Sequence, residues 1–151
     1  MGPENKRTLY HAGLAHGANH KVTLVSQTME FLAASGAEDP AATLRPLLTA
    51  ALENALASGD AALTSPIVRG DVRTVQAHLD DITENAPATI PSYVPMAKAT
   101  ADRAVLDGRL LPIRAARLVR MLDEALVRVG ETSALPGALA SRGHSHRSDT
   151  R

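Results

Sequence analysis

One short stretch, YHAGLAHGAN at residues 10–19, holds the side chains best suited to chemistry. His11 and Asn19 are eight residues apart, which in an α-helix separates them by two turns and by about 80° around the axis. Both can therefore face one cleft, where an imidazole can transfer a proton and a carboxamide can orient a ligand. His11 also falls within the apolar stripe of this helix, so a partly buried histidine bonded to a backbone carbonyl is the alternative.

Two further histidines of this stretch have a spacing found in metal sites. His16 and His20 lie at positions i and i+4, from which two imidazoles on one helix face can bind one metal ion. The glutamate of the HExxH motif is absent, and the sequence indicates no third ligand. We therefore assign no metal site and expect both histidines to be solvated or at an interface.

The segment of residues 59–71, GDAALTSPIVRGD, holds a second group of polar side chains and is called the connector below. Thr64 and Ser65 supply hydroxyl groups, and Arg69 lies just before the amino end of a predicted helix. Backbone amides and a guanidinium group at such a corner can bind an anion, so these three residues are candidate substrate ligands. The alternative is a structural turn in which Arg69 pairs with a carboxylate such as that of Asp60 or Asp71.

Composition excludes several classes of function. Sixteen basic residues balance sixteen acidic ones without a basic patch, so we expect no nucleic-acid partner. No apolar run approaches the roughly 20 residues of a membrane-spanning helix, and no signal-peptide core is present, so we expect no membrane partner and a cytoplasmic location. The chain has no cysteine, which excludes disulfides and thiolate chemistry. It also lacks a GxGxxG turn, a GxxxxGK loop and a paired-carboxylate motif.

Helices are predicted to position all of these residues. Residues 6–35 form the longest uninterrupted pattern, with apolar side chains on two opposite faces and several Gly and Ala residues in the first half. Such a helix is expected to lie centrally, with neighbours on two sides. Capping residues and Gly or Pro breaks delimit four more helices, at about 40–58, 72–85, 92–107 and 112–129. No segment alternates apolar and polar residues, so the fold class is all-α, with about five helices packed around the long N-terminal one.

The predicted organisation is one helical domain with two short flanks. Residues 1–7 are a leader, residues 8–130 form the domain, and residues 131–151 are rich in Ser, Gly, Arg and His and are predicted to be disordered. Within the domain, the helix that begins near Pro40 has the clearest amphipathic pattern, with leucine and alanine recurring at steps of three and four up to Leu56.

The sequence also resembles the C-terminal helical domain of a family of poorly characterised Rossmann-like oxidoreductases. The resemblance covers about residues 8–110. It is carried by Tyr10-His11-Ala12 with Asn19, Leu63-Thr64-Ser65-Pro66-Ile67, Arg69-Gly70-Asp71, Thr74-Val75 and His78-Leu79.

The resemblance implies a fold, an activity and a division of labour. Domains of this family follow an NAD(P)-binding Rossmann domain and are similar to the all-α domains of 6-phosphogluconate dehydrogenase, pyrroline-5-carboxylate reductase and ketopantoate reductase. The chain would thus be the substrate-side and dimerisation domain of an NAD(P)-dependent oxidoreductase acting on a small carbonyl compound or hydroxy acid. In ketopantoate reductases the equivalent helix carries a catalytic lysine and, two turns later, an asparagine. His11 falls at the lysine position and Asn19 at the asparagine position, which implies that both are catalytic.

Two departures from the family limit what the resemblance implies. Histidine is mostly neutral near pH 7, where lysine is charged, and Ser65 stands where the family usually has glycine. Residues 1–7 leave no room for a Rossmann domain, so NADP or NAD is expected to bind only through a domain absent from this chain, and the chain alone is expected to be inactive. We expect a homodimer, and a non-catalytic helical protein-interaction module is the alternative function.

Overall fold

The computed structural model of the chain describes residues 3–133, and the side chains of residues 6–131. Within residues 3–133 there are helices and no strands, so the predicted all-α class is confirmed. Five helical rods are present in this part of the chain, if the three N-terminal helical segments are taken as one. The disorder predicted for the tail falls outside the described residues from position 134 onward.

The N-terminal rod is one continuous helix with a change of pitch in its middle. It consists of α1 (Pro3–Ala15), the π-helical turn η1 (His16–His20) and α2 (Lys21–Ala34). The predicted helix over residues 6–35 is therefore confirmed, with a start three residues earlier. It ends because Gly36 adopts a φ of 92°, which lets the Ala37 N–H donate to the Leu32 carbonyl at 2.9 Å.

The second rod, α3 (Pro40–Ser58), begins and ends at the predicted signals. A side-chain oxygen of Asp39 accepts a hydrogen bond from the Ala42 N–H at 2.9 Å, and Pro40 occupies the first turn. Pro46 lies inside the helix, which nevertheless begins at Pro40.

The connector begins with a short 3-10 helix, η2 (Gly59–Ala62), and leads to α4 (Val72–Asn85). Arg109 holds the connector in place from the turn between the last two helices. Its guanidinium donates to the Leu63 carbonyl at 2.8 Å and to the Asp60 carbonyl, and pairs with the Asp107 carboxylate at 2.5 Å. The connector is thus an ordered segment, as predicted.

The last two long helices follow another 3-10 turn, η3 (Pro87–Thr89). Helix α5 (Ile90–Leu106) starts two residues before the predicted position at Ser92, and α6 (Pro112–Ser133) continues three residues past Gly130. Residues 131–133, assigned to the tail from the sequence, are therefore helical.

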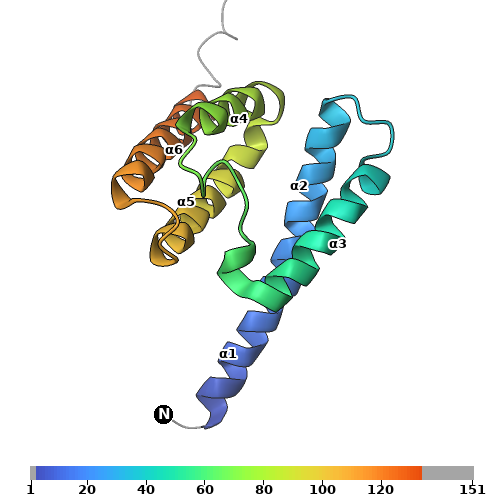
Figure 1. Cartoon of the computed structure of the whole chain (residues 1–151). Coiled ribbons are helices and arrows are strands. Elements are labelled where there is room, and N and C mark those ends of the chain that lie inside the picture. Colours follow the sequence, from blue (N-terminus) through green and yellow to red (C-terminus); the bar gives the residue numbers. More distant parts are fainter. Residues whose placement is uncertain (1–2, 134–151) are drawn as a thin grey trace, which may run out of the picture.

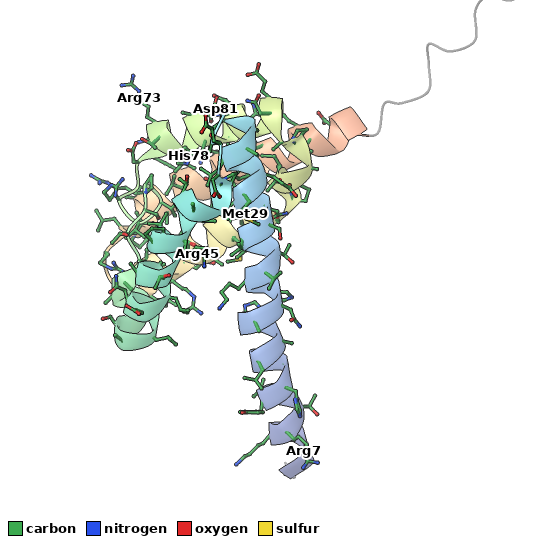
Figure 2. All side chains as sticks on the ribbon, turned by 90° about the vertical axis from the view of Figure 1, so that its right-hand side faces the viewer. Arg7, Met29, Arg45, Arg73, His78 and Asp81 are labelled. Carbon is green, nitrogen blue, oxygen red and sulfur yellow. The ribbon has the colours of Figure 1, made fainter. Side chains whose placement is uncertain are left out.

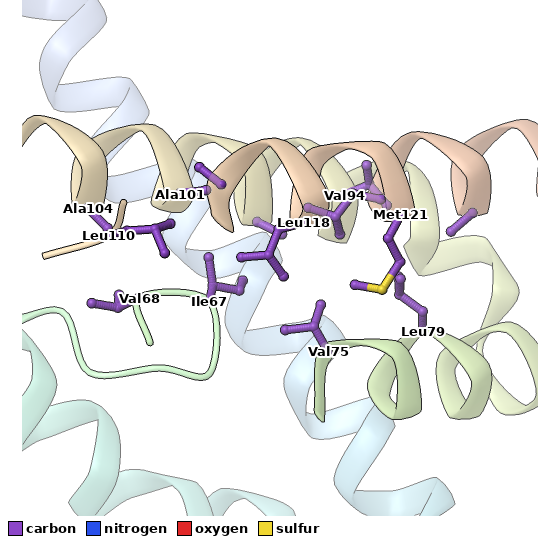
Figure 3. Packing of buried hydrophobic residues seen from close by; sticks show 14 of the residues in the cluster. Ile67, Val68, Val75, Leu79, Val94, Ala101, Ala104, Leu110, Leu118 and Met121 are labelled. Atoms are coloured by element: carbon purple, nitrogen blue, oxygen red, sulfur yellow. The ribbon is translucent and has the colours of Figure 1, made fainter. Parts of the chain in front are cut away.

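The hydrophobic core lies between α4, α5 and α6. Val75 and Leu79 of α4, Val94 of α5, and Leu118 and Leu122 of α6 are fully buried there. Figure 3 shows that the connector adds two further apolar side chains, those of Ile67 and Val68, at one end of this core.

The prediction that the long helix lies at the centre is wrong. Every side chain from residue 6 to residue 24 is exposed, and we call this part the exposed rod. Figures 1 and 2 show α1 extending away from the other helices, with Arg7 near its far end, whereas α2 lies beside α3. Among the described residues, no element covers the apolar side chains in the first half of this helix.

The amphipathic pattern of α3 is also largely unsatisfied within the chain. Leu44 is buried at 5% exposure, whereas Leu47 and Leu56 are 67% and 80% exposed. Leu47 and Leu56 are nine residues apart and so lie on opposite sides of the helix. Exposed leucines of this kind are typical of a surface covered by another polypeptide. Among the described residues, none of the helices combines the length and apolar character needed to cross a membrane.

Candidate functional site

His11 and Asn19 both lie on the exposed rod. The expectation that His11 is partly buried is wrong, because α1 has no neighbouring helix at this point. The His11 ring makes an edge contact with the Tyr10 ring, at 5.9 Å between centroids, and neither His11 nor Asn19 makes a side-chain hydrogen bond to another described residue. Both side chains are therefore available to a second molecule.

The π-helical turn η1 lies between these two residues. A π-turn contains more residues per turn than an α-helix, so it reduces the angle between side chains on either side of it. In a regular α-helix, His11 and Asn19 would be separated by about 80° around the axis. The π-turn reduces this angle, so the two side chains lie more nearly on the same side of the rod. Single π-turns inside α-helices occur frequently at functional sites.

His16 and His20 form the two ends of this π-turn. Their Nδ1 atoms are 2.8 Å apart, and their rings cross at 86° with centroids separated by 4.8 Å. One ring therefore donates an N–H to the other. Within the described part of the chain no third carboxylate, imidazole or thiol gathers with them as a metal ligand.

The three candidate residues of the connector share one turn before α4. Thr64 and Arg69 are exposed, and the Ser65 hydroxyl accepts a hydrogen bond of 3.4 Å from the Val68 N–H. The Arg69 guanidinium has no ion pair within 4 Å among the described residues. One possible partner, the Asp60 carboxylate, pairs with Arg103 at 2.8 Å instead. The guanidinium therefore remains available for an anion.

The end of this turn is defined by Gly70 and Asp71. Gly70 has a φ of 66°, and a Cβ atom at this position would lie 3.1 Å from the Arg114 side chain. The Asp71 carboxylate accepts hydrogen bonds from the Thr74 hydroxyl at 2.7 Å and from the Thr74 N–H at 3.1 Å. These bonds, with a smaller contribution from the charge of Arg69, lower the pKa of Asp71 below its ordinary value. Asp71 thus acts as the cap of α4, as predicted, and Arg69 is a nearby charge.

The structure shows no direct bond between the two groups of candidate residues. No hydrogen bond or ion pair among the described residues joins His11 or Asn19 to Thr64, Ser65 or Arg69.

A further polar pair, which sequence analysis did not assign to the site, lies at the other end of α2. His78 Nδ1 and the Tyr93 hydroxyl are 3.3 Å apart, and burial raises the pKa of Tyr93. These residues lie 15 positions apart on different helices, so no local spacing connects them. The signals that could have pointed to them were the His78-Leu79 pair within the family resemblance and the rarity of tyrosine in this chain.

Comparison with protein families identifies the domain. The family model of a domain of unknown function, DUF2520, matches residues 2–100. The chain belongs to the DUF2520 family. The DUF2520 match includes the exposed rod, the connector, His78 and Tyr93, and it ends within α5, so the core helix α6 lies beyond it. No curated protein and no solved structure matches the chain.

The described residues do not fit a nicotinamide dinucleotide. Dinucleotide sites of the Rossmann type bind the pyrophosphate at a glycine-rich turn between a parallel strand and a helix. Residues 3–133 of this DUF2520 chain contain no strand, and its sequence contains no GxGxxG turn. The described residues therefore supply no dinucleotide site of the Rossmann type.

Proposed function

We propose that this DUF2520 chain is the substrate-side and dimerisation domain of an NAD(P)-dependent oxidoreductase that acts on a small carbonyl compound or hydroxy acid. The observation that carries the proposal is the exposed rod, which presents apolar and polar side chains together. Leu9, Tyr10 and Leu14 are 73%, 65% and 53% exposed, and His11 and Asn19 lie among them. A second polypeptide that covers the apolar side chains would enclose the imidazole and the carboxamide in an interface.

Each candidate residue has a role that fits its chemistry. The His11 imidazole would give a proton to a substrate oxygen, and the Asn19 carboxamide would orient the substrate by hydrogen bonds. The Arg69 guanidinium would pair with a substrate carboxylate, with the hydroxyl groups of Thr64 and Ser65 beside it. No hydrogen bond or ion pair among the described residues joins these two groups, so in this proposal the connector of a second copy supplies the carboxylate ligand.

The proposal requires two partners. The Rossmann domain would supply the nicotinamide, and α3 would make the contact between two copies of the chain. Leu52 and Leu56 of α3 are one turn apart and 44% and 80% exposed, so they form a short apolar row on this helix. Burial of such a row on association is favourable by about 25 cal/mol per Å² of apolar surface.

The test is an activity assay of the chain in complex with an NADP-binding Rossmann domain encoded beside it. NADPH oxidation is followed with a series of small 2-oxo acids. His11→Ala is expected to lower kcat by about a hundredfold, and Asn19→Ala is expected to raise KM. Thr23→Ala, on the same exposed rod, is the control with wild-type kinetics. Wild-type kinetics for His11→Ala in an active complex would refute the catalytic assignment.

The second candidate is a non-catalytic helical protein-interaction module. It is favoured by the same apolar surface and by the lack of contact between His11 and the connector. The two functions differ in one measurable respect. An interaction module loses its partner when Leu14 is replaced by Lys and has no NADPH-dependent turnover with any neighbouring domain, whereas the oxidoreductase domain has turnover that depends on His11.

A further inference from the structure

A groove that the proposed function does not use lies where the C-terminal end of α2 meets α4 and the start of α5. Its volume is about 500 Å³, and its walls include Phe31 of α2, His78, Asp81 and Asn85 of α4, and Tyr93 of α5. Figure 2 shows His78 and Asp81 on the part of the molecule where α2 ends, far from Arg7 at the start of the exposed rod. Three helices thus contribute side chains to one concave surface.

The aromatic residues of the chain are concentrated here. The sequence has two tyrosines, one phenylalanine and no tryptophan, and two of these three aromatic side chains line this groove. Phe31 and Tyr93 each pack partly against the core and remain partly exposed. The face of an aromatic ring attracts a cation within about 6 Å of its centroid, so two partly open rings form a suitable wall for a positively charged group.

The charge in the groove is negative and uncompensated. Asp81 is exposed, and none of the ion pairs among the described residues includes its carboxylate. Arg73, one and a half turns before His78, points away from the groove in Figure 2. The wall therefore has a carboxylate and two aromatic rings without a protein cation between them.

The remaining polar groups are fixed or available as hydrogen-bond partners. The contact of 3.3 Å between His78 Nδ1 and the Tyr93 hydroxyl joins α4 to α5 across the groove. The Asn85 side chain donates to the Asp81 backbone carbonyl at 3.0 Å, which leaves its own oxygen as an acceptor. An ammonium group has only donors, so acceptors on the wall suit it.

We propose that this groove binds a small organic cation, a primary amine whose ammonium group pairs with Asp81 while its apolar part lies between Phe31 and Tyr93. The site is independent of the proposed oxidoreductase function. Phe31 is 20 residues from His11 on the same rod, a separation of about 30 Å at 1.5 Å per residue. Failure of one proposal leaves the other untouched.

The test uses three probes of one shape that differ in charge: cyclohexylamine, cyclohexanol and cyclohexanecarboxylate. In a Tyr10→Phe variant of the full chain, Tyr93 is the only tyrosine, and no tryptophan is present, so intrinsic fluorescence reports on the groove alone. Cyclohexylamine is expected to change Tyr93 fluorescence saturably at neutral pH, and to bind more tightly than cyclohexanol. Equal affinity for the amine and the alcohol, or no saturable change with the amine, would overturn the proposal.

Two neighbouring aspartates provide a matched pair of variants. Asp81→Asn is expected to weaken amine binding about threefold to fivefold and to leave cyclohexanol binding unchanged. Asp80→Asn removes the same charge one residue away, where the carboxylate accepts from Gln76 at 2.7 Å and does not line the groove. It is expected to bind the amine like the wild type, and an equal loss in both variants would show a general charge effect and refute the site.

Discussion

At the scale of single residues, the clearest device is the cap between the connector and α4. Asp71 satisfies the amide and the hydroxyl of Thr74, and Gly70 gives the chain the left-handed conformation that the turn needs. Because this cap follows directly after Arg69, it also fixes where the guanidinium emerges from the turn. The stability of the cap and the position of a candidate ligand are thereby linked.

The cap makes stability depend on pH. The Thr74 hydroxyl and N–H lower the pKa of Asp71 from its ordinary value of 3.8. A carboxylate whose pKa is lower in the folded chain than in the unfolded chain stabilises the fold above the unfolded pKa, and this contribution is lost as the pH falls through the folded pKa. Between about pH 6 and about pH 2, wild-type protein should therefore lose more free energy of unfolding than Asp71→Asn, as measured by urea denaturation.

Thr74→Val provides the control for this prediction. It removes the hydroxyl, the largest cause of the lowered pKa, but keeps the backbone N–H. Its pH dependence should fall between those of the wild type and Asp71→Asn. Parallel curves for all three proteins would contradict the assignment of the effect to this cap.

At the scale of helices, local signals and long-range packing differ in how far the sequence predicts them. The ends of α3 and the start of α4 follow from Asp39, Pro40, Gly59 and Asp71, because a cap acts within a few residues. Which helix faces are buried cannot be predicted in the same way. Leu56 of α3 and Leu79 of α4 both belong to apolar stripes, but their side chains are 80% and 0% exposed. Apolar spacing shows that a face requires a partner and cannot tell which polypeptide supplies it.

The π-turn shows a second limit of prediction from sequence. A π-turn adds one residue to a helical turn and so shifts the positions of the side chains that follow it. The π-turn here, HGANH, has no large apolar side chain, so this shift does not interrupt the hydrophobic pattern of the sequence. The chemistry of His11 and Asn19 was visible from residue type and approximate spacing. Their exposure and their alignment depended on packing and pitch, which the sequence does not encode locally.

The glycines of the exposed rod give a prediction at this scale. A Cβ atom at Gly13 or Gly17 would meet no atom within 4 Å, so alanine at either position should stabilise the rod by about 0.5–1 kcal/mol. Slower amide hydrogen exchange across the rod is the measurement. Gly70→Ala is the opposite case, because its φ is 66° and its Cβ would lie 3.1 Å from Leu110 and Arg114; it should lower the stability of the whole chain.

At the scale of the whole molecule, the chain consists of a covered part and an uncovered part. The bundle of α4, α5 and α6 holds almost all of the buried apolar core, whereas most leucines of α3 and the apolar residues of the exposed rod face solvent. The two parts are joined where Phe31 packs against the core and where the Ser92 hydroxyl donates to the Gln27 side chain at 3.0 Å. Association with another chain and stability of the fold should therefore respond to different residues.

Substitutions of two leucines should affect fold stability and association separately. Leu118→Ala, in the fully buried part of α6, should lower the free energy of unfolding by about 2–5 kcal/mol. Leu56→Lys, on the exposed face of α3, should change it by less than about 0.5 kcal/mol. In sedimentation, the wild type should associate to a dimer and Leu56→Lys should remain a monomer. A wild-type protein that stays monomeric at every concentration would exclude the homodimer.

The exposed rod has a consequence for how this family can diversify. None of its side chains from Lys6 to Leu24 belongs to the core, so this segment tolerates exchange without repacking the bundle. Insertion or removal of one residue at the π-turn would rotate α1 about the helix axis by about 100°. A different set of its side chains would then face a binding partner. Recognition and foldability can thus evolve on separate stretches of the same helix.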